Sequence, residues 1–99
     1  MAGVWVYILE CNDKSLYVGS CQGKEPEARV WDHNNRTYPN AYTAKRLPVR
    51  LVHAEYYATI TEGLAAERRY KGWSRAKKLA LIAGNWERLQ QLSKRRGGE

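Results

Sequence analysis

Arg29 and His33 stand four residues apart in a segment predicted to be a short helix, so their side chains share one helix face. Arginine offers a planar, permanently charged fork that suits a phosphate. Histidine can share a proton with the same phosphate or form a hydrogen bond to it. The pair is therefore a candidate for phosphate chemistry. The competing interpretation is an exposed polar helix face, with Val30 and Trp31 directed inward.

Glu67 is a second candidate, because it lies mid-helix beside the apolar residues 64–66 and Tyr70. A carboxylate bordering an apolar face is either paired, here with Lys71 at i+4, or a ligand of a hard cation. Magnesium sites that serve phosphates often use one or two carboxylates plus water, so a single glutamate is sufficient. The sequence leaves both interpretations of Glu67 open.

Tyr7 and Tyr17 fall on the two strands of a predicted hairpin. A three-residue loop between the strands pairs Tyr7 with Gly19 and Tyr17 with Leu9, which places both tyrosines on one sheet face. A two-residue loop would separate them, and we expect the first register. Gly19 would then leave space for a close approach, which favours Tyr7 as the residue that activates water. The alternative for each ring is an ordinary core position.

Local signals predict the elements that must position these side chains. Thr59-x-x-Glu62 has the pattern of a helix capping box, and Ser74 and Asn85 can cap two further helices. The expected fold is α+β, with a small three-stranded antiparallel sheet flanked by helices. Residues 1–94 form one domain in this interpretation, and 95–99 form a flexible basic tail. The predicted strands are 4–10, 16–19 and 49–57, and the helices are 26–33, 60–71, 75–83 and 86–92.

The net charge of +7 is unevenly distributed, since residues 68–99 carry ten Lys/Arg against two Asp/Glu. Such a basic half favours a polyanionic partner, although a solubilising surface would look the same. The predicted loop 36–46 interleaves basic and tyrosine side chains, which can contact phosphates and stack on bases. The expected nucleic-acid contacts are Arg36, Tyr42, Lys45, Arg46, Arg68, Lys71, Arg75, Lys77 and Lys78.

The sequence also excludes several classes of protein. No apolar run approaches the roughly 20 residues that span a bilayer, and no signal peptide is visible, so a cytoplasmic protein is expected. Cys11 and Cys21 would sit about 20 Å apart along the hairpin and are expected to be free thiols. No zinc-protease, phosphate-loop or dinucleotide-binding motif is present.

Taken in order, the candidate segments resemble the GIY-YIG nuclease superfamily, in particular its small stand-alone bacterial members. The resemblance covers about residues 3–92, and several motifs in the correct order make it specific. It rests on Trp5-Val6-Tyr7, Leu16-Tyr17-Val18-Gly19, Arg29 four residues before His33-Asn34, Ala41-Tyr42-Thr43, and Ala66-Glu67-Arg68-Arg69-Tyr70.

The resemblance implies a role for each of these residues. Tyr7 and Tyr17 flank the reacting phosphate, and one of them orients or deprotonates the water. Arg29 binds the phosphate and His33 assists beside it. Glu67 holds a single divalent cation, Mg²⁺ or Mn²⁺.

The family also uses an asparagine after the glutamate helix, for which Asn85 is the candidate, unless Asn85 is only a helix cap. The implied activity is metal-dependent endonuclease-type hydrolysis of nucleic acid, with DNA favoured over RNA. The first alternative is a non-catalytic nucleic-acid-binding module of the same fold. The second is a protein-interaction domain that uses the Trp and Tyr side chains.

Overall fold

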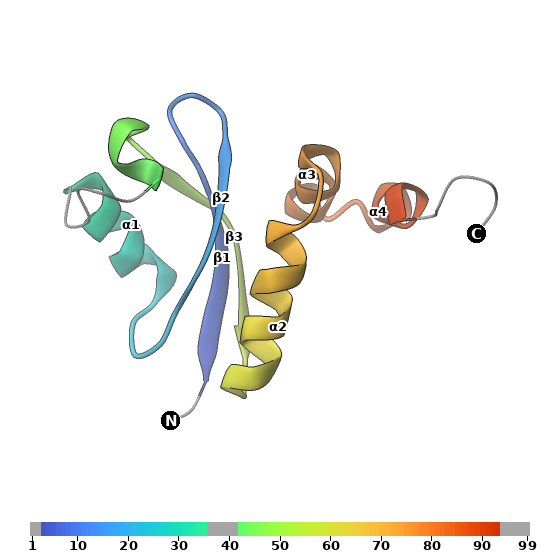
Figure 1. The fold of residues 1–99 in the computed structure, drawn as a ribbon, viewed down its shortest axis with the longest axis horizontal. Coiled ribbons are helices and arrows are strands. Elements are labelled where there is room, and N and C mark those ends of the chain that lie inside the picture. The colour runs from blue at the N-terminus through green and yellow to red at the C-terminus, as the bar shows by residue number, and fades with distance from the viewer. Residues whose placement is uncertain (1–2, 36–41, 94–99) are drawn as a thin grey trace.

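The computed structural model describes residues 3–35 and 42–93 (Figure 1). The expected α+β fold is confirmed, and the predicted elements are present within one or two residues. Arg36 and the expected tail 95–99 lie outside the described residues. The elements are β1 (Val4–Glu10), β2 (Leu16–Cys21), α1 (Pro26–Asn34), the 3-10 helix η1 (Tyr42–Lys45), β3 (Arg50–Tyr57), α2 (Ile60–Lys71), α3 (Arg75–Ala83) and α4 (Trp86–Ser93).

The three strands form one antiparallel sheet in the order β2-β1-β3. The amide of Cys11 donates to the carbonyl of Ser15, which closes the expected three-residue loop. Within the hairpin, Tyr7 therefore pairs with Gly19 and Leu9 pairs with Tyr17. The predicted register is confirmed, and the two tyrosines share one face of the sheet.

Helices cover both faces of the sheet, because successive strand residues point to opposite sides (Figure 1). The face that carries Tyr7 and Leu9 packs against α1 and is called the tyrosine face below. The opposite face carries Val6 and Ile8 and packs against α2, with Leu81 of α3 in the same cluster. The strand β2 is an edge strand, so both faces can be reached around it.

The orientation of α1 agrees only in part with the polar-face interpretation, since Val30 packs against the sheet as that interpretation expected but Trp31 does not. Trp31 is 63% exposed, whereas His33 is 3% exposed and faces the sheet. The side chain of Asn34 fixes this orientation, because its amide donates to the Val49 carbonyl at 3.0 Å and its oxygen accepts from the Val49 amide at 2.7 Å. The 3-10 helix η1, which the sequence did not predict, follows α1 and packs against it.

The caps of the later helices agree with the sequence. Thr59 and Ser74 accept from the amides of Glu62 and Lys77, respectively, and Gly84 ends α3 in the left-handed conformation that favours glycine. Asn85 accepts from the amide of Arg88 and thus caps α4.

Cys11 and Cys21 are both buried free thiols, as expected. Within residues 3–35 and 42–93, no helix is both long and apolar enough to cross a bilayer.

Candidate functional site

The rings of Tyr7 and Tyr17 converge on Gly19. A Cβ atom at Gly19 would lie 2.7 Å from the Tyr7 hydroxyl and 3.0 Å from a ring carbon of Tyr17. Glycine is therefore required at this position, because any side chain would displace one of the rings. The space that we expected to be open above Gly19 is filled by the tyrosines. Tyr7 is only 1% exposed, whereas Tyr17 is partly exposed.

Arg29 lies at the centre of the tyrosine face. Its guanidinium is within hydrogen-bonding reach of the Tyr7 hydroxyl, and its charge acts on Tyr7, Cys21 and His33. Burial raises the pKa of Tyr7, and Arg29 counteracts only part of that effect. Tyr7 is consequently a neutral phenol at neutral pH, held next to a permanent cation.

His33 completes the same group. Its Nδ1 atom shares a hydrogen bond of 2.6 Å with the Thr43 hydroxyl, and its ring meets the Tyr17 ring edge-on at 5.6 Å. Burial lowers the pKa of His33, and the nearby Arg29 charge lowers it further. The imidazole is therefore neutral at pH 7, so that the positive charge of this face comes from Arg29.

Tyr42 extends the tyrosine face outward from Tyr17. The two rings are stacked with centroids 6.1 Å apart, and the guanidinium of Arg46 lies 3.9 Å from the Tyr42 centroid. Arg46 also forms a 3.0 Å ion pair with Asp13 at the hairpin turn. The predicted loop contact Tyr42 is thus beside the tyrosines, while the charge of Arg46 is partly neutralised. Lys45 is exposed on the same 3-10 helix.

Glu67 lies across the edge strand from the tyrosines. It accepts a 2.9 Å hydrogen bond from the hydroxyl of Ser20, the residue that follows Gly19 and points to the opposite face. It also forms a 3.0 Å ion pair with Lys71, which is the pairing that the sequence left open. Glu67 therefore reaches β2, and β2 separates it from the tyrosine face.

A shallow cavity of about 240 Å³ connects the two sides of β2 at its edge. The cavity joins the stacked rings of the tyrosine face to the basic end of α2 and the start of α3. An extended polyanion lying in it would meet aromatic rings on one side and ammonium groups on the other. The lining residues are Leu16, Tyr17, Val18, Tyr42, Lys71 and Lys78.

The remaining candidates lie elsewhere. The guanidinium of Arg75 donates to the Lys14 carbonyl at 2.6 Å, and the ammonium of Lys77 lies 5.1 Å from the Trp73 ring centroid. Arg68 is exposed beside Glu67. The structure shows Asn85 in its alternative role as a helix cap, at the junction of α3 and α4.

Sequence reasoning missed two residues that hold the candidate side chains. Thr43 anchors His33, and Ser20 anchors Glu67. Thr43 stands inside a segment that carries the family resemblance and Ser20 directly follows one, so their position was the available signal. Each hydroxyl supplies a hydrogen-bond partner to a polar side chain that is buried or partly buried, and such side chains need one.

Comparison with known families identifies this arrangement. Residues 3–80 match the GIY-YIG catalytic domain, a stretch that runs from before Tyr7 to beyond Glu67. The chain belongs to the GIY-YIG family. The GIY-YIG domain is that of a nuclease family, which implies a nucleic-acid substrate.

Relatives of this GIY-YIG protein carry the name UPF0213 and have similar lengths. A UPF0213 protein of Syntrophus aciditrophicus (strain SB) is 44% identical over 89 residues, covering 90% of this chain and 100% of the relative. One of Staphylococcus aureus (strain Mu3 / ATCC 700698) is 46% identical over 78 residues, covering 79% and 92%. The solution NMR structure of the UPF0213 protein BH0048 from Bacillus halodurans is 33% identical and covers 92% of this chain and 97% of its own, with a TM-score of 0.53.

GIY-YIG nucleases generally use a divalent metal, and the described residues fit such an ion only in part. No group of three or more His, Cys, Asp or Glu side chains within the described chain could form a protein-only metal cage. Glu67 borders another open cavity of about 240 Å³, which Leu64, Arg68 and Lys71 also line. One carboxylate beside open space fits a hydrated cation that shares its remaining positions with substrate oxygens.

Proposed function

We propose that this GIY-YIG protein hydrolyses phosphodiester bonds of nucleic acid, with DNA favoured over RNA. The observation that supports the proposal is the tyrosine face, where the half-buried Arg29 lies beside Tyr7 and His33, while Tyr17 packs against His33 and meets Tyr7 at Gly19. Arg29 binds the phosphate and stabilises the charge that develops on it. His33, held neutral by burial, donates or accepts a hydrogen bond beside that phosphate without adding charge.

The partly exposed Tyr17 is the better candidate for contact with the attacking water. The hydroxyl of Tyr7 is buried and lies against Arg29, so we assign Tyr7 the role of holding the guanidinium. This assignment reverses the expectation from the sequence, because the space above Gly19 that favoured Tyr7 is filled. The cation, Mg²⁺ or Mn²⁺, would be held by Glu67 across the β2 edge and would supply Lewis-acid stabilisation to the leaving oxygen of a strand that lies over this edge.

The test of the proposal is cleavage of labelled DNA and RNA, as single strands, duplexes and branched forms, with Mg²⁺ or Mn²⁺ and with EDTA. Cleavage that requires the cation supports hydrolysis. The second candidate function is binding without cleavage, which the engagement of Glu67 by Lys71 and Ser20 favours. Tight binding in every arm with no cleavage in any of them would establish that second function.

The two tyrosines should differ in their contribution to turnover. We expect Tyr17→Phe to lower kcat by about 10²-fold or more, the usual contribution of a group that assists proton transfer, with little change in substrate affinity. Tyr7→Phe should cost less, because the phenol contacts Arg29 and not the water. Single-turnover rates at saturating protein measure both. A larger loss in Tyr7→Phe would return the water-activating role to Tyr7.

Binding should depend steeply on salt, because Arg68, Lys71 and Lys78 form the basic side of the β2 edge. With Arg29 as a fourth cation, neutralising about four phosphates gives roughly a hundredfold loss of affinity between 50 and 200 mM salt. Arg68→Gln and Lys78→Gln should each reduce the slope of log K against log salt by about 1. Arg88→Gln, the same charge change on α4, is the matched control. A flat salt profile would contradict this basic surface.

A further inference from the structure

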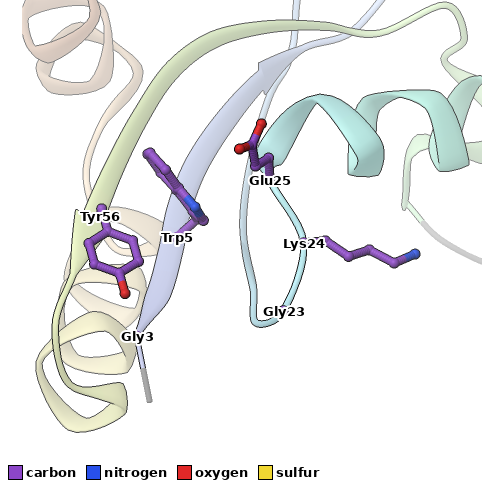
Figure 2. Close-up of a pocket in the computed structure, with 6 residues that line it drawn as sticks. All are labelled: Gly3, Trp5, Gly23, Lys24, Glu25 and Tyr56. Carbon is purple, nitrogen blue, oxygen red and sulfur yellow. The ribbon is translucent and has the colours of Figure 1, made fainter. Parts of the chain in front are cut away.

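A third cavity, of about 290 Å³, opens at the other end of the tyrosine face (Figure 2). It lies between the start of β1, the end of β3 and the connector from β2 to α1. We call it the Trp5–Tyr56 pocket, and its lining residues are Gly3, Trp5, Gly23, Lys24, Glu25 and Tyr56. Its volume suits one ring system and is small for a larger ligand, since drug-sized sites start at about 300 Å³.

Two aromatic rings form one wall of the pocket. Trp5 and Tyr56 are direct partners on neighbouring strands, and their rings meet edge-on with centroids 5.3 Å apart. Tyr56 is 54% exposed, which leaves a ring surface open to a ligand. The hydroxyl end of the ring lies against Gly3, where a Cβ atom would be 1.7 Å from the Tyr56 hydroxyl. Glycine at position 3 is thus what allows the ring to stand here.

The charged residues of the pocket disfavour a phosphate inside it. The ammonium of Lys24 is engaged by Asp32 at 3.0 Å and points away from the rings (Figure 2). Glu25 is the N-cap residue of α1, yet within the described chain its side chain makes no capping hydrogen bond. Its carboxylate is directed to the side where Trp5 lies (Figure 2). The pocket therefore offers stacking surfaces and hydrogen-bond acceptors to an uncharged planar group that carries N–H donors.

The Trp5–Tyr56 pocket lies on the same face of β1 as the candidate site. Trp5 and Tyr7 stand two residues apart on the same face of β1, which is about 7 Å. Adjacent nucleotides of a stacked strand are about 3.4 Å apart, so the distance corresponds to roughly one or two nucleotides. A strand whose phosphate lies at Arg29 would bring a neighbouring base to the rings.

We infer that the Trp5–Tyr56 pocket binds a nucleobase of the substrate, one or two nucleotides from the phosphate at Arg29. The inference rests on the proposed function for its ligand class but not on cleavage. The base enters unpaired, because a base inside a duplex has both faces stacked and cannot meet the rings. The Glu25 carboxylate favours bases with an exocyclic amino group, so cytosine is preferred to thymine at this position.

Binding of labelled single strands in EDTA, measured by fluorescence anisotropy, tests the inference without any cleavage. A strand with one abasic position, moved along the sequence in turn, should bind at least about fivefold more weakly at one position only, as loss of one stacked base predicts. In Tyr56→Ala and in Trp5→Phe/Tyr56→Ala that position-specific loss should disappear. Trp31→Ala, which removes an exposed tryptophan outside the pocket, should retain it.

Glu25→Gln tests the preference for the base. The native protein should bind cytosine more tightly than thymine at the sensitive position, and Glu25→Gln should reduce the difference. A uniform abasic profile in the native protein, or an unchanged profile in Tyr56→Ala, would overturn the inference. A position-specific profile in a protein that never cleaves DNA or RNA would instead refute only the proposed hydrolysis.

Discussion

Glu67→Ala should abolish cleavage while leaving the fold intact. Lewis-acid stabilisation by a cation is worth several kcal/mol, so its loss corresponds to about 10³-fold or more in rate. The cost in stability should be modest, because the ion-pair partner Lys71 is 55% exposed at its side chain and the part-buried Ser20 hydrogen bond contributes about 1 kcal/mol. Single-turnover cleavage, thermal unfolding and calorimetric titration with Mn²⁺ measure the three quantities.

Lys71→Gln separates the two interpretations of Glu67. It removes the same ion pair but keeps the carboxylate and its Ser20 hydrogen bond. If Glu67 holds a cation, Lys71→Gln should bind Mn²⁺ at least as tightly as the native protein, since a competing cation is gone. If the pair is structural, both variants should lose its contribution to stability, Glu67→Ala should also lose the Ser20 hydrogen bond, and neither should change metal binding. Cation-dependent cleavage by Glu67→Ala would refute the assignment outright.

The hairpin and its register were predictable because they depend on neighbouring residues. The three-residue turn sets which residues pair, and strand alternation then places Tyr7, Gly19 and Tyr17 on one face. Helix starts at Thr59 and Ser74 were equally local, since each cap involves an amide three residues ahead. These features require no knowledge of distant packing.

The side of the sheet on which each helix packs was not predictable in the same way. The position of Glu67 depends on α2 packing against Val6 and Ile8, a contact that local sequence does not encode. On α1, hydrophobicity correctly placed Val30 against the sheet but wrongly placed Trp31 inward, and the Nδ1 atom of the buried His33 is bonded to Thr43. Hydrophobic periodicity does not predict the burial of a polar side chain whose partner is distant in the sequence.

Arg29→Met should eliminate turnover, by about 10³-fold or more, and should also change the titration of His33. An arginine that stabilises a phosphoryl transition state contributes 10³–10⁵ in rate in other enzymes. The Arg29 charge lowers the pKa of His33, so removing it should raise that pKa towards its ordinary value. Methionine retains an unbranched apolar stem, so the packing of α1 is largely preserved.

NMR titration of the His33 ring measures this effect without substrate or cation. His53, on the other sheet face and bonded to Glu55, provides resonances that report whether the fold is unchanged. Arg50→Met is the matched control, because Arg50 is exposed on β3 and pairs with Glu10. It should leave both the His33 titration and turnover near native values. An unchanged His33 pKa in Arg29→Met would show that the Arg29 charge does not reach His33. The phosphate site proposed around Tyr7, Tyr17 and His33 would then have no arginine to bind the phosphate.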